Sequence, residues 1–95
     1  MLTAPETTKT QAGLSNHPYI AKTDDILDGE PVIVGTRTAV RAIVERWKFG
    51  DAPEDIARKL PHLRLSHIFA ALSYYDDHRD EIEHYIRLNQ VPVDD

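Results

Sequence analysis

Apolar residues recur at helical spacing through most of the chain after position 37. In the first such repeat, which Gly50 ends, charged residues occupy the side opposite the apolar ones. The apolar members of this repeat are Val40, Ile43, Val44 and Trp47. This spacing places them on one face of an α-helix, and that face has to be covered by another part of the protein. The chain is therefore expected to fold mainly from packed helices.

The start of this first helix and the start of the next one carry local signals. Thr36 or Thr38 can cap the first helix with its hydroxyl group. The second helix is expected to be short and to begin at Pro53, with either Ala52 or Asp51 as its cap.

Two further helices are expected beyond a tight link at Pro61–Arg64. In the third helix, the apolar side chains that share a face are Leu65, Ile68, Leu72 and Tyr75. Polar residues at 76–78 interrupt that repeat, and a fourth helix follows. The side chains that share a face of the fourth helix are Ile82, Tyr85, Ile86 and Asn89.

Two segments in front of the helices have strand-like composition, residues 18–23 and residues 31–34. An isolated two-stranded ribbon is marginal in water, so these strands either pair as a hairpin within the chain or pair with a second copy. The expected fold is mainly α, with about four helices preceded by one or two short β-strands.

The length of 95 residues suits one folded unit. That unit is expected at residues 18–90, between a flexible N-terminal lead at 1–17 and a short C-terminal tail at 91–95. No apolar run approaches the length of a membrane span. The chain has no cysteine, and its first residues lack the pattern of a signal peptide. We therefore expect a cytoplasmic protein with no membrane partner.

Charge is distributed unevenly along the chain, whose formal net charge is −5. Residues 1–35 carry two basic and five acidic groups, residues 36–72 carry seven and four, and residues 73–95 carry two and seven. The net charge alone argues against nucleic-acid binding. However, a basic centre between two acidic ends indicates separate surfaces for separate partners.

The sequence does not have the motifs of a phosphate-binding loop, a histidine metal site or a serine-based catalytic site. Residues 29–37, GEPVIVGTR, contain two glycines but neither the spacing nor the lysine of a phosphate-binding loop. The four histidines of the second half are five, eleven and six positions apart, so neighbouring ones do not share a helical face as metal ligands would. No serine is locally paired with a histidine and an acid. We expect no enzymatic activity, no cofactor, no metal and no small-molecule substrate.

The second and third expected helices, with the link between them, have the outline of a helix-turn-helix (homeodomain-like) unit. In such a unit the second helix can enter the major groove of DNA. On the outline alone, a small helical bundle with no nucleic-acid role is an equally good alternative.

Side chains at the start of the third helix favour DNA contact. With its apolar face in the core, this helix would turn outward Arg64, Ser66, His67 and Ala70. Residues of these types can contact base edges or phosphates. No acidic residue lies between Arg58 and Tyr75. Cations suited to phosphate contact nearby are Arg37, Arg41, Arg58 and Lys59.

Several of these segments occur in the same order in a known family. They are GEPVIVGTR, an amphipathic helix ending in Phe49-Gly50, APEDIA at 52–57, PHL at 61–63 and AALSYY at 70–75. Over roughly residues 19–89 the chain resembles domain-of-unknown-function family 433. The resemblance implies a small helix-turn-helix domain with a short β element in front.

The same resemblance implies an antitoxin of a type II toxin–antitoxin pair, similar to the VapB class. Such a protein neutralises a PIN-like ribonuclease toxin and binds operator DNA as an autorepressor. A homodimer through the N-terminal strands and the first helix is expected. The alternatives are a stand-alone DNA-binding transcriptional regulator and a protein-interaction module without DNA binding.

The acidic C-terminal part is the expected toxin surface, because a ribonuclease presents a basic groove to its substrate. The side chains expected to contact the toxin are Arg79, Ile82, Tyr85, Ile86, Arg87 and Val91. The chain departs from the family pattern at Arg64, where a capping threonine is usual. Because arginine cannot accept hydrogen bonds from the first amides of a helix, we expect the third helix to begin one turn later than Leu65.

Overall fold

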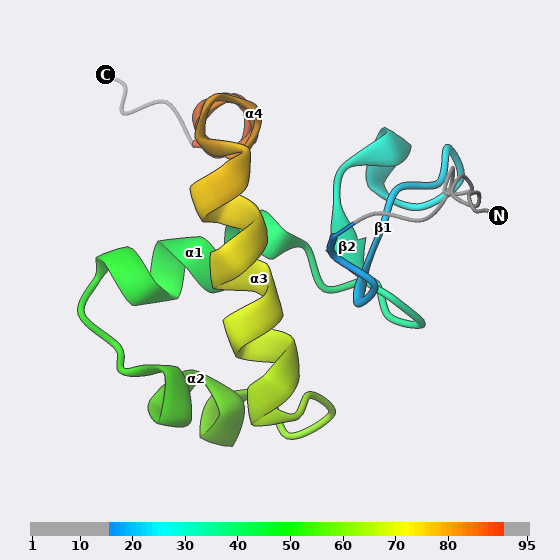
Figure 1. The fold of residues 1–95 in the computed structure, drawn as a ribbon. Helices are drawn as coiled ribbons and strands as arrows, with labels where there is room; N and C mark the ends of the chain where they lie inside the picture. Colours follow the sequence, from blue (N-terminus) through cyan, green and yellow to red (C-terminus); the bar gives the residue numbers. More distant parts are fainter. Residues whose placement is uncertain (1–15, 91–95) are drawn as a thin grey trace, which may run out of the picture.

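In the computed structural model, which describes residues 16–90, a two-stranded ribbon precedes four α-helices (Figure 1). The elements in chain order are β1 (Ile20–Ala21), the 3-10 helix η1 (Leu27–Gly29), β2 (Val32–Ile33), α1 (Val40–Lys48), α2 (Pro53–Lys59), α3 (Leu65–Asp77) and α4 (Arg79–Leu88). The predicted fold, mainly α with short strands in front, is confirmed. Among the described helices, none is both long and apolar enough to span a bilayer.

The two strands pair with each other in antiparallel register. Ile20 lies opposite Ile33, and Ala21 lies opposite Val32. Val32 also forms a bridge with Ala39. Both edges of β2 are therefore paired within the chain. Of the two predicted alternatives, the strands form a hairpin within one chain.

Neither Thr36 nor Thr38, in the turn between β2 and α1, caps the helix as predicted. The Thr36 hydroxyl donates to the carbonyl of Ile33 at 2.9 Å and accepts from the backbone N–H of Thr38 at 2.9 Å. The residue at the N-terminal cap of α1 is Ala39, whose methyl side chain cannot accept a hydrogen bond. The predicted threonine cap was wrong, because Thr36 instead closes the turn that leads into the helix.

The other helix boundaries agree with the predictions. Gly50 follows α1 with a φ of +108°, a backbone conformation that side chains disfavour and glycine tolerates. The second helix begins at Pro53 after Ala52, one of the two predicted caps. The break between α3 and α4 falls at His78, inside the predicted interruption.

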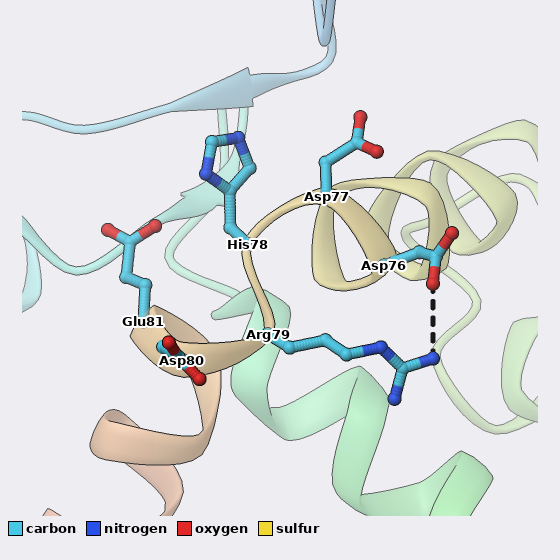
Figure 2. Close-up of a pocket in the computed structure, with 6 residues that line it drawn as sticks. All are labelled: Asp76, Asp77, His78, Arg79, Asp80 and Glu81. Carbon is cyan, nitrogen blue, oxygen red and sulfur yellow. Dashed lines mark hydrogen bonds and ion pairs between the residues drawn. The ribbon is translucent and has the colours of Figure 1, made fainter.

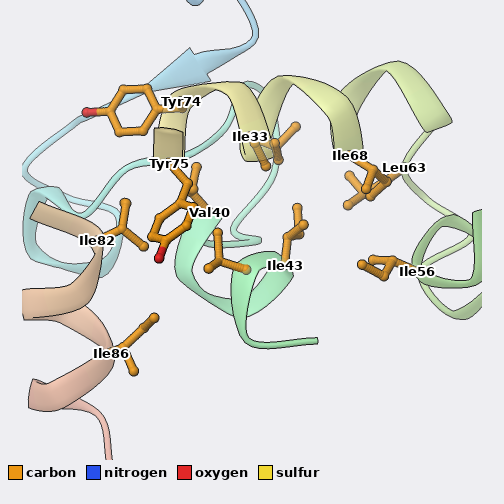
Figure 3. Close-up of a cluster of buried hydrophobic side chains, with 12 residues drawn as sticks. Ile33, Val40, Ile43, Ile56, Leu63, Ile68, Tyr74, Tyr75, Ile82 and Ile86 are labelled. Carbon is orange, nitrogen blue, oxygen red and sulfur yellow. The ribbon is translucent and has the colours of Figure 1, made fainter. Parts of the chain in front are cut away.

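The hydrophobic core lies between α1 and α3, with α2 near the start of α3 and α4 following its end (Figures 1 and 3). The buried side chains that form it are Ile33, Val40, Ile43, Val44, Ile56, Leu63, Ile68, Ala71, Tyr74, Tyr75, Ile82 and Ile86. Trp47, predicted to belong to the same face of α1, is instead 41% exposed. Burial of this cluster fixes α3 across the other helices and leaves one of its sides open to solvent.

Candidate nucleic-acid interface

The predicted pair of helices joined by a tight link is present as α2, residues 60–64 and α3. Leu63 in the link is buried against Ile56 of α2 and Ile68 of α3 within the core cluster. Its backbone N–H donates to the carbonyl of Leu60 at 2.8 Å, which closes the link into a turn. The apolar anchor in the turn therefore holds the two helices at a fixed angle, as a helix-turn-helix requires.

The third helix begins where its apolar repeat begins, at Leu65, and Arg64 takes the cap position. The backbone N–H of Arg64 donates to Nδ1 of His67 at 2.9 Å. This is the half of a capping box in which a side chain in the first turn reaches back to the cap residue. The predicted later start was wrong, because His67 supplies an acceptor that the arginine lacks.

The four residues predicted to face outward from α3 differ in their surroundings. Arg64 is exposed, whereas Ser66, His67 and Ala70 are partly buried. The Ser66 hydroxyl oxygen is buried and has no hydrogen-bond partner among the described residues. The His67 ring lies edge-on to Tyr19, with ring centroids 5.1 Å apart. The ribbon therefore flanks α3 at His67, and Arg64 is the most accessible of the four.

The open side of α3 also carries two apolar residues one turn apart. Leu65 is 37% exposed and Phe69 is 50% exposed. The prediction that Leu65 belongs to the core was wrong, because the buried side chains of α3 are Ile68, Ala71, Tyr74 and Tyr75. Sequence spacing alone does not distinguish these faces, since α3 is apolar on more than one side.

The turn that follows β2 brings Arg37 to the link between α2 and α3. Thr38 lies two residues before the start of α1. Its hydroxyl oxygen is 2.8 Å from Nε2 of His62 in the link. Arg37 is exposed beside this contact. The contact between Thr38 and His62 thus brings the turn that carries Arg37 to the link that carries Arg64, although the turn and the link are far apart in sequence.

The two cations at the end of α2 are exposed but have acidic neighbours. Arg58 forms an ion pair with Asp55, and Lys59 lies 3.0 Å from Asp51. Exposed pairs of this kind are worth little energetically, so either side chain can exchange its partner for a phosphate.

Arg41 does not belong to this surface, contrary to the prediction. Its Nε donates to Glu30 at 2.7 Å, and Glu30 is only 4% exposed. Arg41 also lines a depression that contains Tyr85 and Leu88 of α4. A buried carboxylate holds this guanidinium by both charge and geometry, so Arg41 is part of the fold rather than a phosphate contact.

Some of the residues predicted to contact a toxin are buried and others are exposed. Ile82 is 0% exposed and Ile86 is 7% exposed, because both lie in the core, so neither is available as a surface anchor. Tyr85 is partly buried, and Arg79 and Arg87 are exposed. Val91 lies outside the described residues.

Two acids of α4 hold that helix against the rest of the protein. Glu81 accepts from the Tyr74 hydroxyl at 2.6 Å and from Lys22 at 2.8 Å. Burial alone would raise the pKa of Glu81, but these two hydrogen bonds outweigh it and hold the pKa below its ordinary value. Glu83 is bound in the same manner by Lys48 and by the Tyr75 hydroxyl.

A shallow depression of about 360 Å³, lined mainly by acidic residues, lies at the junction of α3 and α4 (Figure 2). The residues that line it are Asp76, Asp77, His78, Arg79, Asp80 and Glu81. Asp76 lies 3.1 Å from Arg79, and Asp77 lies 2.8 Å from Nε2 of His17. The junction is therefore an acidic surface with one cation, Arg79, lying across it.

His17 is the only described part of the predicted lead, apart from Asn16, and it is 7% exposed. Its ring packs edge-on against Tyr74 at 5.1 Å. Sequence reasoning missed this residue because its partners lie about sixty positions away. Residues 16–90 contain no group of three or more acidic or histidine side chains arranged to hold a metal ion.

The comparisons with known proteins agree with the geometry of the fold. No curated protein matches the chain. The crystal structure of a DUF433 member protein from Anabaena variabilis ATCC 29413, at 2.00 Å resolution, is similar to it, with 25% sequence identity and a TM-score of 0.68. The match covers 73% of this chain and 68% of that chain. The family model described as "Protein of unknown function (DUF433)" matches residues 20–75. The chain therefore belongs to the DUF433 family.

Proposed function

We propose that the protein is the antitoxin of a type II toxin–antitoxin pair, which neutralises a PIN-like ribonuclease toxin and represses its own operon by binding operator DNA. DNA contact is made by α2, the link and the start of α3. Toxin contact is made by the acidic junction of α3 and α4. The two partners thus use opposite ends of α3.

The observation that carries the proposal is the group of exposed cations at the start of α3. Residues 58–75 contain no acid, and Arg64 stands exposed at the helix N-terminus. Arg37 reaches the same end through the contact between Thr38 and His62. Arginines in these positions can bind a guanine edge with two hydrogen bonds or pair with phosphates. Leu65 and Phe69 can meet thymine methyl groups beside them.

The toxin half of the proposal is supported by charge. Asp76 and Asp77 have side chains that are 71% and 55% exposed, and Asp80 is exposed beside them. A ribonuclease has to attract RNA with a cationic groove, which an acidic surface can cover. Glu81 and Glu83 are engaged within the fold, so the three aspartates are the proposed toxin contacts.

Co-expression with the adjacent reading frame tests the proposal. Expression of the neighbouring nuclease should arrest growth, and this chain should restore growth by forming a complex that shifts the upstream DNA. A variant with Asp76, Asp77 and Asp80 all changed to lysine should lose the rescue and still bind DNA. A chain that neither rescues growth nor binds the upstream DNA would contradict both halves.

The exposed pair Leu65 and Phe69 favours a second candidate, a protein-interaction module without DNA binding. Apolar residues one turn apart on an open helix face are a common docking surface for another helix. Under this alternative, Phe69→Ser abolishes partner binding while Arg64→Ala has no effect on any activity of the chain.

A further inference from the structure

Phe49, at the end of α1, is the most exposed large apolar side chain among the described residues, at 91%. It belongs neither to the core nor to the surfaces proposed for DNA and toxin. Exposing a phenyl group to water is unfavourable, and aromatic residues are enriched at the centres of protein interfaces. Phe49 is therefore available as an anchor for a partner surface.

A groove of about 300 Å³ lies beside Phe49, between the end of α1 and α4. The residues that line it are Glu45, Lys48, Phe49, Glu83, Ile86, Arg87 and Gln90. Ile86 contributes apolar surface from the core, and the methylene groups of Lys48 and Arg87 add to it. The protein thus carries an apolar projection and a partly apolar recess side by side.

The charges around this groove balance, although the chain as a whole is acidic. Lys48 and Glu83 pair with each other. Glu45 stands on the α1 wall, where it keeps a long contact of 3.6 Å with Arg41, and Arg87 stands on the α4 wall. Glu45 and Arg87 thus carry opposite charges on opposite walls, an arrangement that a two-fold contact between two copies could pair.

We propose that this groove is the self-association site of the protein, and that Phe49 of each copy inserts into the groove of the other. The opposite charges on the two walls favour a second copy over an unrelated partner, because a two-fold contact requires the same patch to carry both halves. Because both edges of β2 are paired within the chain, β2 has no edge available to a second copy.

The groove is lined by the end of α1 and by α4, whereas Arg64 directly precedes α3. In Figure 1, α4 follows the end of α3 and α2 lies near its start. A dimer formed through the groove keeps both helix-turn-helix units uncovered, as binding to two half-sites of an operator requires. The inference does not depend on the proposed function, since self-association needs neither DNA nor toxin.

Sedimentation of the purified full chain over a concentration series tests the site. The wild type should reach twice the 10.8 kDa mass of one chain. Phe49→Ser should raise the dimer dissociation constant about 30-fold, as loss of an interface anchor does. Because Phe49 is exposed in the single chain, Phe49→Ser should unfold at the same temperature as the wild type at protein concentrations where both are monomers. Val34→Ser, at an exposed apolar position just after β2, is the matched control and should leave the dimer intact.

A charge exchange gives a second, independent readout. Glu45→Arg should weaken the dimer by like-charge contact with Arg87, and adding Arg87→Glu to the same chain should restore it. A wild-type chain that remains a monomer overturns the inference, even if Phe49→Ser then weakens binding of the neighbouring nuclease. A dimer that is unaffected by Phe49→Ser and by Glu45→Arg, or one that Val34→Ser breaks, also overturns it.

Discussion

Glu30 is a buried carboxylate that one guanidinium group neutralises. It accepts from Arg41 Nε at 2.7 Å, and its side chain is 5% exposed. Changing Glu30 to alanine leaves Arg41 partly buried without its main partner, which typically costs about 3 kcal/mol of folding free energy. Urea unfolding of Glu30→Ala should show a loss of this size, and Glu30→Gln should lose less. A loss below about 0.5 kcal/mol, the range of ordinary surface changes, would contradict this role.

Glu81 makes the stability of the protein dependent on acid pH. Its pKa is lowered in the folded state, so its contribution is present above its unfolded pKa and is lost as the pH falls through the folded value. Glu81→Gln should be less stable than the wild type by about 1 kcal/mol at pH 7, because its partners are partly solvated.

Unfolding of both proteins at several pH values measures this difference, which should begin to shrink as the pH falls to about 4 and should vanish once the pH is below the lowered folded pKa. Asp80→Asn, at an exposed position, serves as the control for a general effect of removing one negative charge. A difference between wild type and Glu81→Gln that stays constant down to pH 3 would show that the charge of Glu81 does not stabilise the fold.

The sequence did not predict what some individual side chains contact. Arg41 looked like a phosphate contact because it is a cation near other cations, but its partner Glu30 lies eleven positions earlier in another element. Ile82 and Ile86 were correctly placed on one helical face, and that face proved to be the core. Periodicity identifies which residues share a face, but it does not say whether a partner or the protein covers that face.

At the scale of elements, the predictions for the helices were mostly confirmed. Proline and glycine set the start of α2 and the end of α1, because both act through local backbone geometry that the sequence displays directly. The rotation of α3 was less predictable, since it depends on contacts with β1 and α1 from distant parts of the chain. The unexpected cap by His67 also came from a side-chain geometry that composition does not reveal.

The start of α3 gives a prediction in which stability and binding change in opposite directions. Aspartate at position 64 can accept hydrogen bonds from the first amides of α3 and favours the positive end of the helix. Arg64→Asp should therefore stabilise the protein by about 1 kcal/mol. It should also abolish binding to the upstream DNA, because it puts an acid where a cation is proposed to meet the duplex.

Thermal unfolding and DNA binding of the same Arg64→Asp preparation measure both effects. Arg64→Ala is the matched variant, since it removes the cation without providing a cap. If Arg64→Asp is destabilising, the assignment of the cap position is wrong. If it binds DNA as the wild type does, the proposed contact is wrong.

At the scale of the whole molecule, the arrangement of α3 separates the proposed partners. Its first turn is flanked by α2, Arg37 and the ribbon, and its last turn enters the acidic junction with α4. The separation was visible in the sequence as a basic centre and an acidic end. Which residues stand at each surface was not visible, because Arg37 and His17 reach their places only through the folded ribbon.

Binding of the purified protein to its upstream DNA, measured by fluorescence anisotropy at several salt concentrations, tests the proposed interface most directly. The wild type should prefer the upstream duplex to a scrambled one, and Arg64→Ala should weaken that binding by about 10-fold or more. Arg37→Ala should reduce the slope of log affinity against log salt by about 1. Arg79→Ala, at the opposite end of α3, should bind as the wild type does. Equal affinity for both duplexes, or binding unchanged by Arg64→Ala and Arg37→Ala together, would contradict the proposed interface.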